Sequence, residues 1–525
     1  MRFHSVLVLC LSCCLCLLQA CSTLPTRQAV TSSYSTQINT QDSYLAQLFE
    51  PLKAQYPGKT GFHVLYNPPQ ALETRLQLIN EAQKTLDLQY YIWDNDKVGA
   101  LALAAILRAA DRGVKVRLLI DDNNSKGLES TYLALSQHPN IQVRVFNPYR
   151  FRKMRALDIL LDYNRITRRM HNKTFIADHQ VALIGGRNMS NQYYDVGESF
   201  QFSDMDVVLV GSAVDDIRHS FDEYWNHEYA YPITQVAKYN PQRLSYKGLR
   251  QQLAKHWENM HLDNDLTQDL NHQSFEHWFK QDLNLDWVNA TVIKDSANKI
   301  NKEIPREQHL SFQMKNIFNH PQSHVDLVSA YFVPDKDARQ VIKALTNEGV
   351  QIRVLTNSFK ANDVPVVHAF YAKHRRELLE DNVQLYEFLP VLPSTLDSGH
   401  RTRLFGTQKF NRKGFSRSSL HAKFMALDNR QVFIGSFNFD PRSVYLNTEI
   451  GVILDSPGLA SVINENMDKD LLKYSFQVKL DSQNRIIWTT ETPSGLKTYY
   501  HEPYLKWWQK IALKLMAILP IEGQM

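Results

Sequence analysis

Two stretches that lie far apart in the chain repeat the same order of apolar and amphipathic segments. The first covers 85–123, and the second, HVDLVSAYFVPDKDARQVIKALTNEGVQIRVLTNS, covers 324–358. In each, an apolar run is followed by an amphipathic segment that ends at a glycine, Gly113 or Gly349, and then by a second apolar run. Strand–helix–strand units of this length are typical of parallel α/β sheets. The repeat therefore predicts two similar α/β domains rather than a solenoid of short repeats.

The chain length agrees with this organisation, because 525 residues suffice for two or three domains. The fold class we predict is α/β, with two tandem domains, each a mixed sheet flanked by helices, forming a pseudo-two-fold pair. Composition divides the chain into a leader at 1–21, a flexible Ser/Thr/Gln-rich tether at 22–44, a first domain at 45–232, a helical linker at 233–284, a second domain at 285–480 and a tail at 481–525.

A polar cassette follows each repeated unit. The first reads MHNKTFIADHQVALIGGRN and the second reads LHAKFMALDNRQVFIGSFN. Turn-like residues separate two apolar runs in each cassette, so each is expected to form a hairpin. The residues that recur at matching offsets are His171 and His421, Lys173 and Lys423, Asp178 and Asp428, Gly185 and Gly435, and Asn188 and Asn438.

The cassette carries the side chains of half an anion site. Residues two apart in a strand point to the same face, which places His171 beside Lys173 and His421 beside Lys423. Two lysines and two asparagines can bind the non-bridging oxygens of a phosphodiester and the charge that develops on them in a pentacoordinate transition state. Two imidazoles on opposite sides of the phosphorus can attack it and protonate the leaving alkoxide, provided one is neutral and the other protonated.

Carboxylates elsewhere in the chain can set the tautomer of each imidazole. The candidates are Asp204 in FSDMDVVL and Glu449 in NTEIGVIL, and Asp206 is a rival because it shares a strand face with Asp204. Asp178 and Asp428 belong to the catalytic cassettes, but we expect them to stabilise the hairpins more than to take part in the chemistry.

The pattern H-x-K-x4-D followed by G-[GS]-x-N, present twice, resembles the phospholipase D superfamily over 85–230 and 285–456. Together with the leader, the motifs MHNK, GGRN and SFNFDPRS are most similar to bacterial cardiolipin synthases of the C type. The resemblance implies two phospholipase D-like domains. It also implies a phosphatidyltransferase that moves a phosphatidyl group onto phosphatidylglycerol through a phosphohistidine, without a cofactor.

The resemblance also implies a role for each matching residue. His171 would be the nucleophile, and His421 would act first as acid and then as base. Residues expected to bind phosphate are Lys173, Lys423, Asn188, Asn438 and Ser436. Gly186 stands where the second cassette has Ser436, so the two half-sites are not equivalent.

Three other functions remain open on the sequence. Water in place of the glycerol hydroxyl would give a phospholipase D that releases phosphatidic acid. A nuclease would use the same cassette, and a non-catalytic envelope lipoprotein would not use it at all. The net charge of +5 fits an anionic partner but does not choose between lipid and nucleic acid.

The leader contains all five cysteines of the chain. Its apolar run is shorter than the ~20 residues that span a bilayer and matches a signal peptide. Leu18-Gln19-Ala20-Cys21 resembles a bacterial lipoprotein box, which predicts lipidation of Cys21; an ordinary secretory signal is the alternative. Since the other cysteines would be removed, we expect neither a disulfide framework nor a cysteine-based metal site. Ser22 favours the outer membrane, with the chain facing the periplasm.

Three further segments favour phospholipid over nucleic acid. Basic stretches precede both cassettes, at 147–170 and 397–419, and can guide anionic headgroups or be merely solvated loops. The segment PYLKWWQKIALKLMAIL at 503–519 predicts a basic amphipathic helix, which can lie in a membrane interface or pack on the second domain. Phosphatidylglycerol and the membrane surface are therefore the expected partners, with phosphatidylethanolamine as a further substrate. No metal motif occurs, so we expect metal-independent activity.

Overall fold

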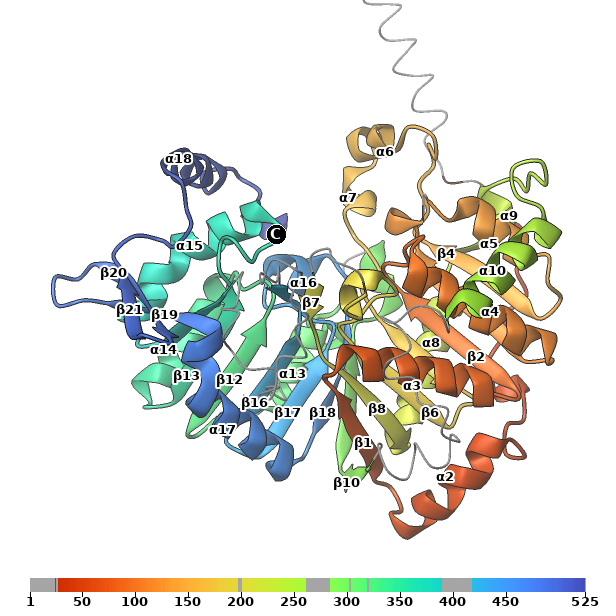
Figure 1. Ribbon diagram of the computed structural model, residues 1–525, viewed down its shortest axis with the longest axis horizontal. Coiled ribbons are helices and arrows are strands. Elements are labelled where there is room, and N and C mark those ends of the chain that lie inside the picture. The colour runs from red at the N-terminus through yellow and green to blue at the C-terminus, as the bar shows by residue number, and fades with distance from the viewer. Residues whose placement is uncertain are drawn as a thin grey trace, which may run out of the picture.

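The computed structural model describes residues 24, 27–125, 127–196, 201–260, 284–301, 304–318, 321–389 and 418–524. The predicted leader, with Cys21, lies outside these residues, as do 261–283 of the predicted linker and nearly all of the second basic stretch. Two α/β halves lie next to each other, each built on its own sheet (Figure 1).

The first half is built on a mixed sheet that has nine strands within the described ranges, in the order β10-β1-β8-β6-β5-β2-β3-β4-β9. Strands β2, β3 and β4 are parallel, and the other pairs are antiparallel. The strands are β1 (Thr60–Leu65), β2 (Thr85–Tyr90), β3 (Lys115–Asp121), β4 (Ile141–Phe146), β5 (Thr174–Ala177), β6 (Val181–Gly185), β8 (Asp206–Gly211), β9 (Ala230–Pro232) and β10 (Asp286–Val288).

The second half repeats this topology. Over the same described residues its sheet has ten strands, in the order β11-β18-β17-β16-β12-β13-β14-β19-β20-β21, and β12, β13 and β14 are the parallel ones. The strands are β11 (Ala290–Lys294), β12 (His324–Ser329), β13 (Gln351–Asn357), β14 (Gln384–Phe388), β16 (Lys423–Leu427), β17 (Gln431–Gly435), β18 (Ile450–Leu454), β19 (Ser475–Leu480), β20 (Ile486–Thr492) and β21 (Gly495–Tyr499). The prediction of two α/β domains with mixed sheets is confirmed.

The repeated sequence units form equivalent elements for the same physical reasons. Helix α4 (Lys97–Asp111) begins at Asp96, whose carboxylate accepts the amide of Gly99, and α14 (Lys336–Asn347) begins at Asp335 in the same way. Each helix is followed by a glycine with positive φ, 104° at Gly113 and 89° at Gly349. These caps fix where each strand-to-helix crossover begins and ends.

Charged residues also recur between the parallel strands. Arg117 Nε lies 2.6 Å from Asp87 Oδ1, and Arg353 Nε lies 2.6 Å from Asp326 Oδ1. Asp87 and Asp326 are almost fully buried, so each needs a charged partner. The same ion pair therefore ties the first two parallel strands together in both halves.

Short helices and 3-10 turns complete the two halves. The remaining α-helices are α2 (Tyr44–Gln55), α3 (Pro68–Glu81), α5 (Glu129–Leu135), α6 (Arg155–Leu161), α7 (Tyr163–Ile166), α8 (Ser212–Asn226), α9 (Ile233–Val236), α10 (Tyr246–Met260), α13 (Leu310–Ile317), α15 (Pro365–Glu380), α16 (Pro441–Tyr445), α17 (Pro457–Tyr474) and α18 (Trp507–Met516). The 3-10 turns are η1 (Ser35–Gln37), η2 (Asp122–Asn124), η3 (Asn191–Tyr193), η4 (Ala297–Ile300), η5 (Arg306–Gln308) and η6 (Glu522–Gln524). None of the described helices is both long enough and apolar enough to cross a bilayer.

The structure places three boundaries differently from the sequence. The chain changes sheets at Asn289, between β10 and β11, so 286–288 belongs to the first sheet. The second sheet continues to Tyr499, past the expected limit at 480. The expected tether is not free over its second part, because Ser35 is buried and both its amide and its hydroxyl donate to Asp222 Oδ2, at 2.9 and 2.6 Å.

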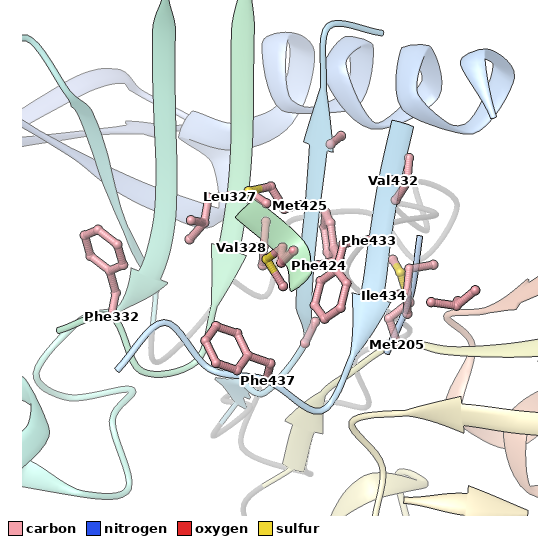
Figure 2. Close-up of a cluster of buried hydrophobic side chains, with 14 of the residues drawn as sticks. Met205, Leu327, Val328, Phe332, Phe424, Met425, Val432, Phe433, Ile434 and Phe437 are labelled. Carbon is pink, nitrogen blue, oxygen red and sulfur yellow. The ribbon is translucent and has the colours of Figure 1, made fainter. Parts of the chain in front are cut away.

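An apolar cluster joins the two halves. Met205, which immediately precedes β8 of the first sheet, shares a buried cluster with Ile434 of β17 (Figure 2), and Val452 of β18 belongs to the same cluster. Strands β6 and β8 approach β17 and β18 at this junction. Because apolar burial across the junction is continuous, the halves are fixed against each other there, and the segments that carry the two cassettes meet.

Candidate active site

Each cassette histidine is held by main-chain hydrogen bonds to the opposite half. The amide of His171 donates to the carbonyl of Thr448 at 2.9 Å, and the amide of His421 donates to the carbonyl of Ser203 at 2.7 Å. The second contact continues a small parallel sheet of β7 (Gln201–Ser203) and β15 (Ser418–Leu420). In both cases the next residue along the partner segment is a candidate carboxylate.

Those carboxylates bind the histidines across the junction. His171 Nδ1 lies 2.9 Å from Glu449 Oε2, and His421 Nδ1 lies 2.6 Å from Asp204 Oδ2. Both carboxylates are almost fully buried, at 0% and 2% exposed. The rival Asp206 is engaged elsewhere, because its Oδ2 lies 2.7 Å from Arg75 Nη2. Each half thus completes the histidine of the other half, and neither half holds a complete site.

This arrangement fixes the proton on each imidazole. An ionised carboxylate can only accept, so Nδ1 of each ring donates to its carboxylate and Nε2 keeps its lone pair. With Nδ1 of His421 protonated in this way, Lys423 Nζ, 2.9 Å away, makes a close contact with that nitrogen and cannot donate to it. Tyr91 contacts His171 with ring centroids 5.0 Å apart, and Tyr193 contacts His421 edge-on at 5.1 Å. The two histidines are 8% and 7% exposed, so both rings are held by packing as well as by hydrogen bonds.

The two lysines reach back to the histidine segments. Lys173 Nζ donates to the carbonyl of His171 at 2.6 Å, and Lys423 Nζ donates to the carbonyl of His421. Strand β5 begins only at Thr174 and β16 at Lys423, so both histidines precede the strands on which they were expected. Both lysines are almost fully buried, and each ammonium group contacts the main chain of the histidine in its own cassette.

The charges of the site are linked across the junction. Burial lowers the pKa of His171 and of His421 well below the usual value, and Lys173 and Lys423 both add to this effect on each ring. Burial also lowers the pKa of Lys173 to about 7. In the free site both imidazoles are therefore neutral, and a bound phosphodiester anion would raise their pKa by offsetting the lysine charges.

The carboxylate partners differ between the halves. Burial raises the pKa of Glu449 to about 7, against the lowering effect of Lys173, and burial also raises the pKa of Asp204. Glu449 accepts hydrogen bonds from the hydroxyls of Ser436 and Ser443, at 2.5 and 3.0 Å. The sequence predicts Ser436 as a phosphate ligand, but its only O–H is used on Glu449. Ser436 therefore contacts the carboxylate, and its role as a phosphate ligand stays a prediction.

The side-chain amides of the two cassette asparagines differ in their hydrogen-bond partners. Asn188 Oδ1 accepts the amide of Ile92 at 3.0 Å, and its Nδ2 donates to Tyr193 Oη at 2.8 Å. Asn438 is also buried, but its Oδ1 has no hydrogen-bond partner within the described part of the chain. Both were predicted to bind phosphate, which needs an N–H donor, whereas the unpartnered Oδ1 of Asn438 is an acceptor; the phosphate-binding role of both asparagines stays a prediction.

The aspartates of the cassettes lie at the far end of each hairpin. Asp178 accepts the amides of Gln83, Lys84 and Thr85 at 2.7–2.9 Å, where β2 begins. Asp428 accepts the amides of Gln322, Ser323 and His324 at 2.8–3.0 Å, where β12 begins. These contacts give both aspartates a structural part and place neither on a cassette histidine.

Sequence reasoning missed two residues that occupy the same position in the two halves. Tyr193 and Ser443 each lie five residues beyond the cassette asparagine. Tyr193 packs on His421, whereas Ser443 donates to Glu449. Ser443 ends the motif SFNFDPRS but was given no role, and no sequence signal indicated that a tyrosine and a serine would serve opposite histidines.

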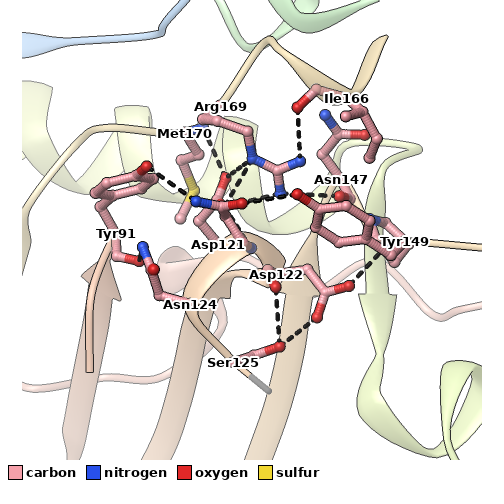
Figure 3. Close-up of polar contacts among 12 residues, drawn as sticks. Tyr91, Asp121, Asp122, Asn124, Ser125, Asn147, Tyr149, Ile166, Arg169 and Met170 are labelled. Carbon is pink, nitrogen blue, oxygen red and sulfur yellow. Dashed lines mark hydrogen bonds and ion pairs between the residues drawn. The ribbon is translucent and has the colours of Figure 1, made fainter. Parts of the chain in front are cut away.

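The first basic stretch is mostly neutralised inside the protein. Arg169 Nη2 lies 2.8 Å from the buried Asp121 (Figure 3), and Arg152 Nη1 lies 2.8 Å from the buried Asp122. Five of its seven cations form ion pairs of this kind: Arg150, Arg152, Arg155, Arg165 and Arg169. Most of this stretch is therefore not a solvated loop, because its arginines anchor the segment that carries α6 and α7; guidance of headgroups by this stretch stays a prediction.

Comparisons with known proteins agree with this site. A family model described as cardiolipin synthase, phospholipase D-like domain, matches residues 76–225 and 314–471. Cardiolipin synthase C of Escherichia coli K12 is 37% identical over 91% of this chain and 99% of its own length. A cardiolipin synthase of Geobacillus sp. WCH70 is 26% identical over 75% of this chain and 63% of its own length.

A solved structure shows that the fold extends beyond these relatives. The phosphatidylserine synthase of Haemophilus influenzae Rd KW20 superposes with a TM-score of 0.53 at 14% identity, over 89% of this chain and 96% of that one. In the part of the chain that the structure describes, no three His, Cys, Asp or Glu residues are grouped so as to hold a metal ion. The duplicated fold, the matched family model and the full-length relative show that this chain is an enzyme of the cardiolipin synthase family within the phospholipase D superfamily.

Proposed function

We propose that this chain joins two phosphatidylglycerol molecules into cardiolipin and releases glycerol. The observation that carries the proposal is the reciprocal pairing of His171 with Glu449 and of His421 with Asp204. Each pairing leaves Nε2 as the reactive nitrogen, and the lysines of both halves lower the pKa of both rings. Two such imidazoles in one cationic site suit a two-step displacement at phosphorus.

In the first step, Nε2 of His171 attacks the phosphorus of the donor phosphatidylglycerol. The P–N bond forms as the bond from phosphorus to the glycerol headgroup oxygen breaks, and His421, protonated once the anionic donor is bound, gives its Nε2 proton to the departing alkoxide. Glycerol leaves, and a phosphatidyl group remains on His171. Lys173 and Lys423 stabilise the charge that develops on the phosphoryl oxygens.

In the second step, a headgroup hydroxyl of another phosphatidylglycerol loses its proton to Nε2 of His421 and attacks the same phosphorus. The P–N bond breaks, which frees His171 and leaves His421 protonated for the next cycle. Water in place of the second lipid would give phosphatidic acid. Transfer is favoured here because a relative that covers 91% of this chain is named a cardiolipin synthase.

The proposal includes a membrane location. Leu18-Gln19-Ala20-Cys21 supports lipidation of Cys21, and Ser22 supports the outer membrane with the site facing the periplasm. Phosphatidylethanolamine is a second donor that the same chemistry accepts, because its headgroup also leaves as an alcohol.

Product analysis tests the proposal. The purified chain is incubated with vesicles of phosphatidylglycerol and phosphatidylethanolamine, and the lipids are measured by mass spectrometry. We expect cardiolipin, with loss of product in His171→Ala and in His421→Ala. Phosphatidic acid as the main product would replace the transferase by a hydrolase. Degradation of plasmid DNA that is lost in His171→Ala would replace both by a nuclease.

A further inference from the structure

The C-terminal helix α18 turns its apolar side outward. Leu513 is its only buried residue, and the helix packs on α15. Trp508 and Leu515, which belong to the apolar face expected from the sequence, are 52% and 63% exposed. The exposed apolar side chains of the helix and the residues after it are Trp507, Trp508, Ile511, Leu515, Ile518 and Leu519. The helix thus packs on the second half while its largest apolar surface stays free.

Two ionic anchors hold the helix in this orientation. Before α18, Glu502 lies 2.5 Å from His368 Nε2 and 3.2 Å from Arg375 Nη2. After α18, Glu522 lies 2.5 Å from Lys373 Nζ and contacts His374 as well. All four basic partners lie on α15, so the segment around α18 is fixed at both ends to one helix. A tail attached in this way presents its apolar side as part of the folded surface.

The first half carries a matching exposed apolar surface on α6. Leu160 is 78% exposed, and Met154, Ile159 and Leu161 are exposed around it. This loop is held from beneath by the buried Asp122, which pairs with Arg152 and Arg155. Its exposed apolar side chains therefore also stand on a rigid ionic base.

Helices α6 and α18 project from the same edge of the molecule, with the site segments β7 and α16 between them (Figure 1). The end of the chain connects the two. Tyr163, on α7 directly after α6, donates its hydroxyl to the side chain of Gln524, and Arg442 of α16 donates to the main-chain carbonyl of Gln524 at 3.1 Å. We use the name docking face for the exposed apolar residues Met154, Ile159, Leu160, Leu161, Trp507, Trp508, Ile511, Leu515, Ile518 and Leu519.

The charges around the docking face identify its partner. Lys506, Lys510 and Lys514 are exposed and form no ion pair with any described residue. Lys153 is exposed beside α6, and the segment 503–519 contains no acid. Tryptophans beside lysines on a fixed helix suit the boundary between headgroups and acyl chains, and the lysines require an anionic surface.

We propose that the docking face inserts into the interface of an anionic phospholipid bilayer and seats the active site on it. This inference rests on the proposed function, because docking would let the headgroup of a membrane lipid reach the histidines without the lipid leaving the bilayer. It differs from attachment through Cys21, which would hold the chain near the membrane without orienting the site. The two apolar regions, one on each half, fix that orientation.

Tryptophan quenching by brominated phospholipid tests the contact directly. The full chain is titrated with vesicles of phosphatidylglycerol and brominated phosphatidylcholine, and with brominated phosphatidylcholine alone. We expect quenching on the anionic vesicles only. The double variant Trp507→Phe, Trp508→Phe keeps the apolar surface, so it should still sediment with anionic vesicles but lose the quenching. Any lipid tether is common to all variants and cancels in this comparison.

A second pair of variants tests the role of both halves. Leu160→Ser with Ile518→Ser should raise the lipid concentration needed for half-maximal quenching by about tenfold or more. Val462→Ser removes an exposed valine from α17, at the opposite edge, and should behave as the unchanged chain. Quenching that is equal on zwitterionic vesicles, or unchanged in the double serine variant, would overturn the proposal. A dimer that the unchanged chain forms without lipid, and that the double serine variant does not form, would also overturn it, because a second copy would then cover the docking face.

Turnover of a short-chain, monomeric phosphatidylglycerol separates this inference from the proposed function. The double serine variant should retain that turnover while it loses turnover on vesicles. If the unchanged chain turns over neither substrate yet shows the anionic quenching, the proposed function fails and the docking face stands.

Discussion

Gly186 lies directly against the carboxylate of Asp204, so closely that a Cβ placed on Gly186 would come within 2.1 Å of Asp204 Oδ1. In the second half the equivalent position is Ser436, whose hydroxyl instead donates to Glu449 at 2.5 Å. The position thus holds a glycine where it packs against an aspartate, and a serine where its hydroxyl bonds to a glutamate. The difference between the two cassettes is a packing requirement of the two carboxylates.

This contact predicts that Gly186→Ser inactivates the enzyme by moving Asp204 away from His421. Displacement of a catalytic group by about 1 Å can cost about 10²-fold in rate, and we expect a fall in kcat of that order. Ser436→Gly is the matched change, and it leaves Glu449 its hydrogen bond from Ser443. Its loss of kcat should be clearly smaller, as measured by cardiolipin formation. Equal losses in the two variants would contradict the assignment.

The activity should fall on both sides of neutral pH. Burial raises the pKa of Glu449 to about 7 and lowers that of Lys173 to about 7. Below this value Glu449 is protonated and can donate to His171 Nδ1, which moves the ring proton to Nε2 and removes the nucleophile. Above it Lys173 loses its charge. A pH profile of kcat should therefore be bell-shaped with apparent pKa values that belong to the pair. In Glu449→Gln, the acid limb should disappear along with most of the activity.

Glu449 should also lower the stability of the folded chain at alkaline pH. Its folded pKa of about 7 is above the ordinary 4.5 of a glutamate, so the folded state binds the proton more tightly and loses stability as the pH rises through this interval. Glu449→Gln should raise the free energy of unfolding at pH 8 by up to about 3 kcal/mol. Denaturant titration at pH 4, where Glu449 is protonated in the folded chain and mostly protonated in the unfolded chain, should show almost no difference. A variant that is less stable than the unchanged chain at pH 8 would count against this account.

The duplicated architecture could be predicted because each level of the sequence agreed with it. Apolar runs, amphipathic segments and the glycines at their ends recurred in the same order, and all indicated the same parallel units. The cassette residues could be found for the same reason. Periodicity and matched spacing act over short distances in the chain, and both halves carried the same signal.

The exchange of carboxylates between the halves could not be predicted in this way. The sequence offers Asp204 and Glu449 as candidates without assigning either to a histidine, and the junction gives Glu449 to His171. The pairing depends on contacts such as the amide of His171 on the carbonyl of Thr448, which join segments far apart in sequence. The partners of the arginines in 147–170 could not be predicted either. Their charge was evident, but their partners at Asp121 and Asp122 became visible only in the fold.

Asp428→Asn should separate stability from catalysis. Although burial raises its pKa, the amides of Gln322, Ser323 and His324 lower it below the ordinary value, so the ionised form is favoured in the folded chain. Its contribution is present at neutral pH and is lost as the pH falls below about 4. We expect a loss of about 1–3 kcal/mol in the free energy of unfolding at pH 7, with kcat per folded molecule unchanged. A large fall in kcat at full stability would instead place Asp428 in the chemistry.

Removal of divalent ions should leave the activity intact, because Lys173 and Lys423 place two ammonium groups where a metal ion would otherwise balance the phosphoryl charge. Both are almost fully buried, and each lowers the pKa of both histidines, so their fields act across the whole site. Cardiolipin formation after exhaustive dialysis against EDTA should stay within about twofold of the untreated enzyme, whereas Lys423→Ala should lose about 10²-fold or more. Added Mg²⁺ should not rescue the variant, since the described residues include no group of three His, Cys, Asp or Glu arranged to hold the ion. Turnover that EDTA abolishes and a divalent ion restores would show instead that the lysines do not suffice.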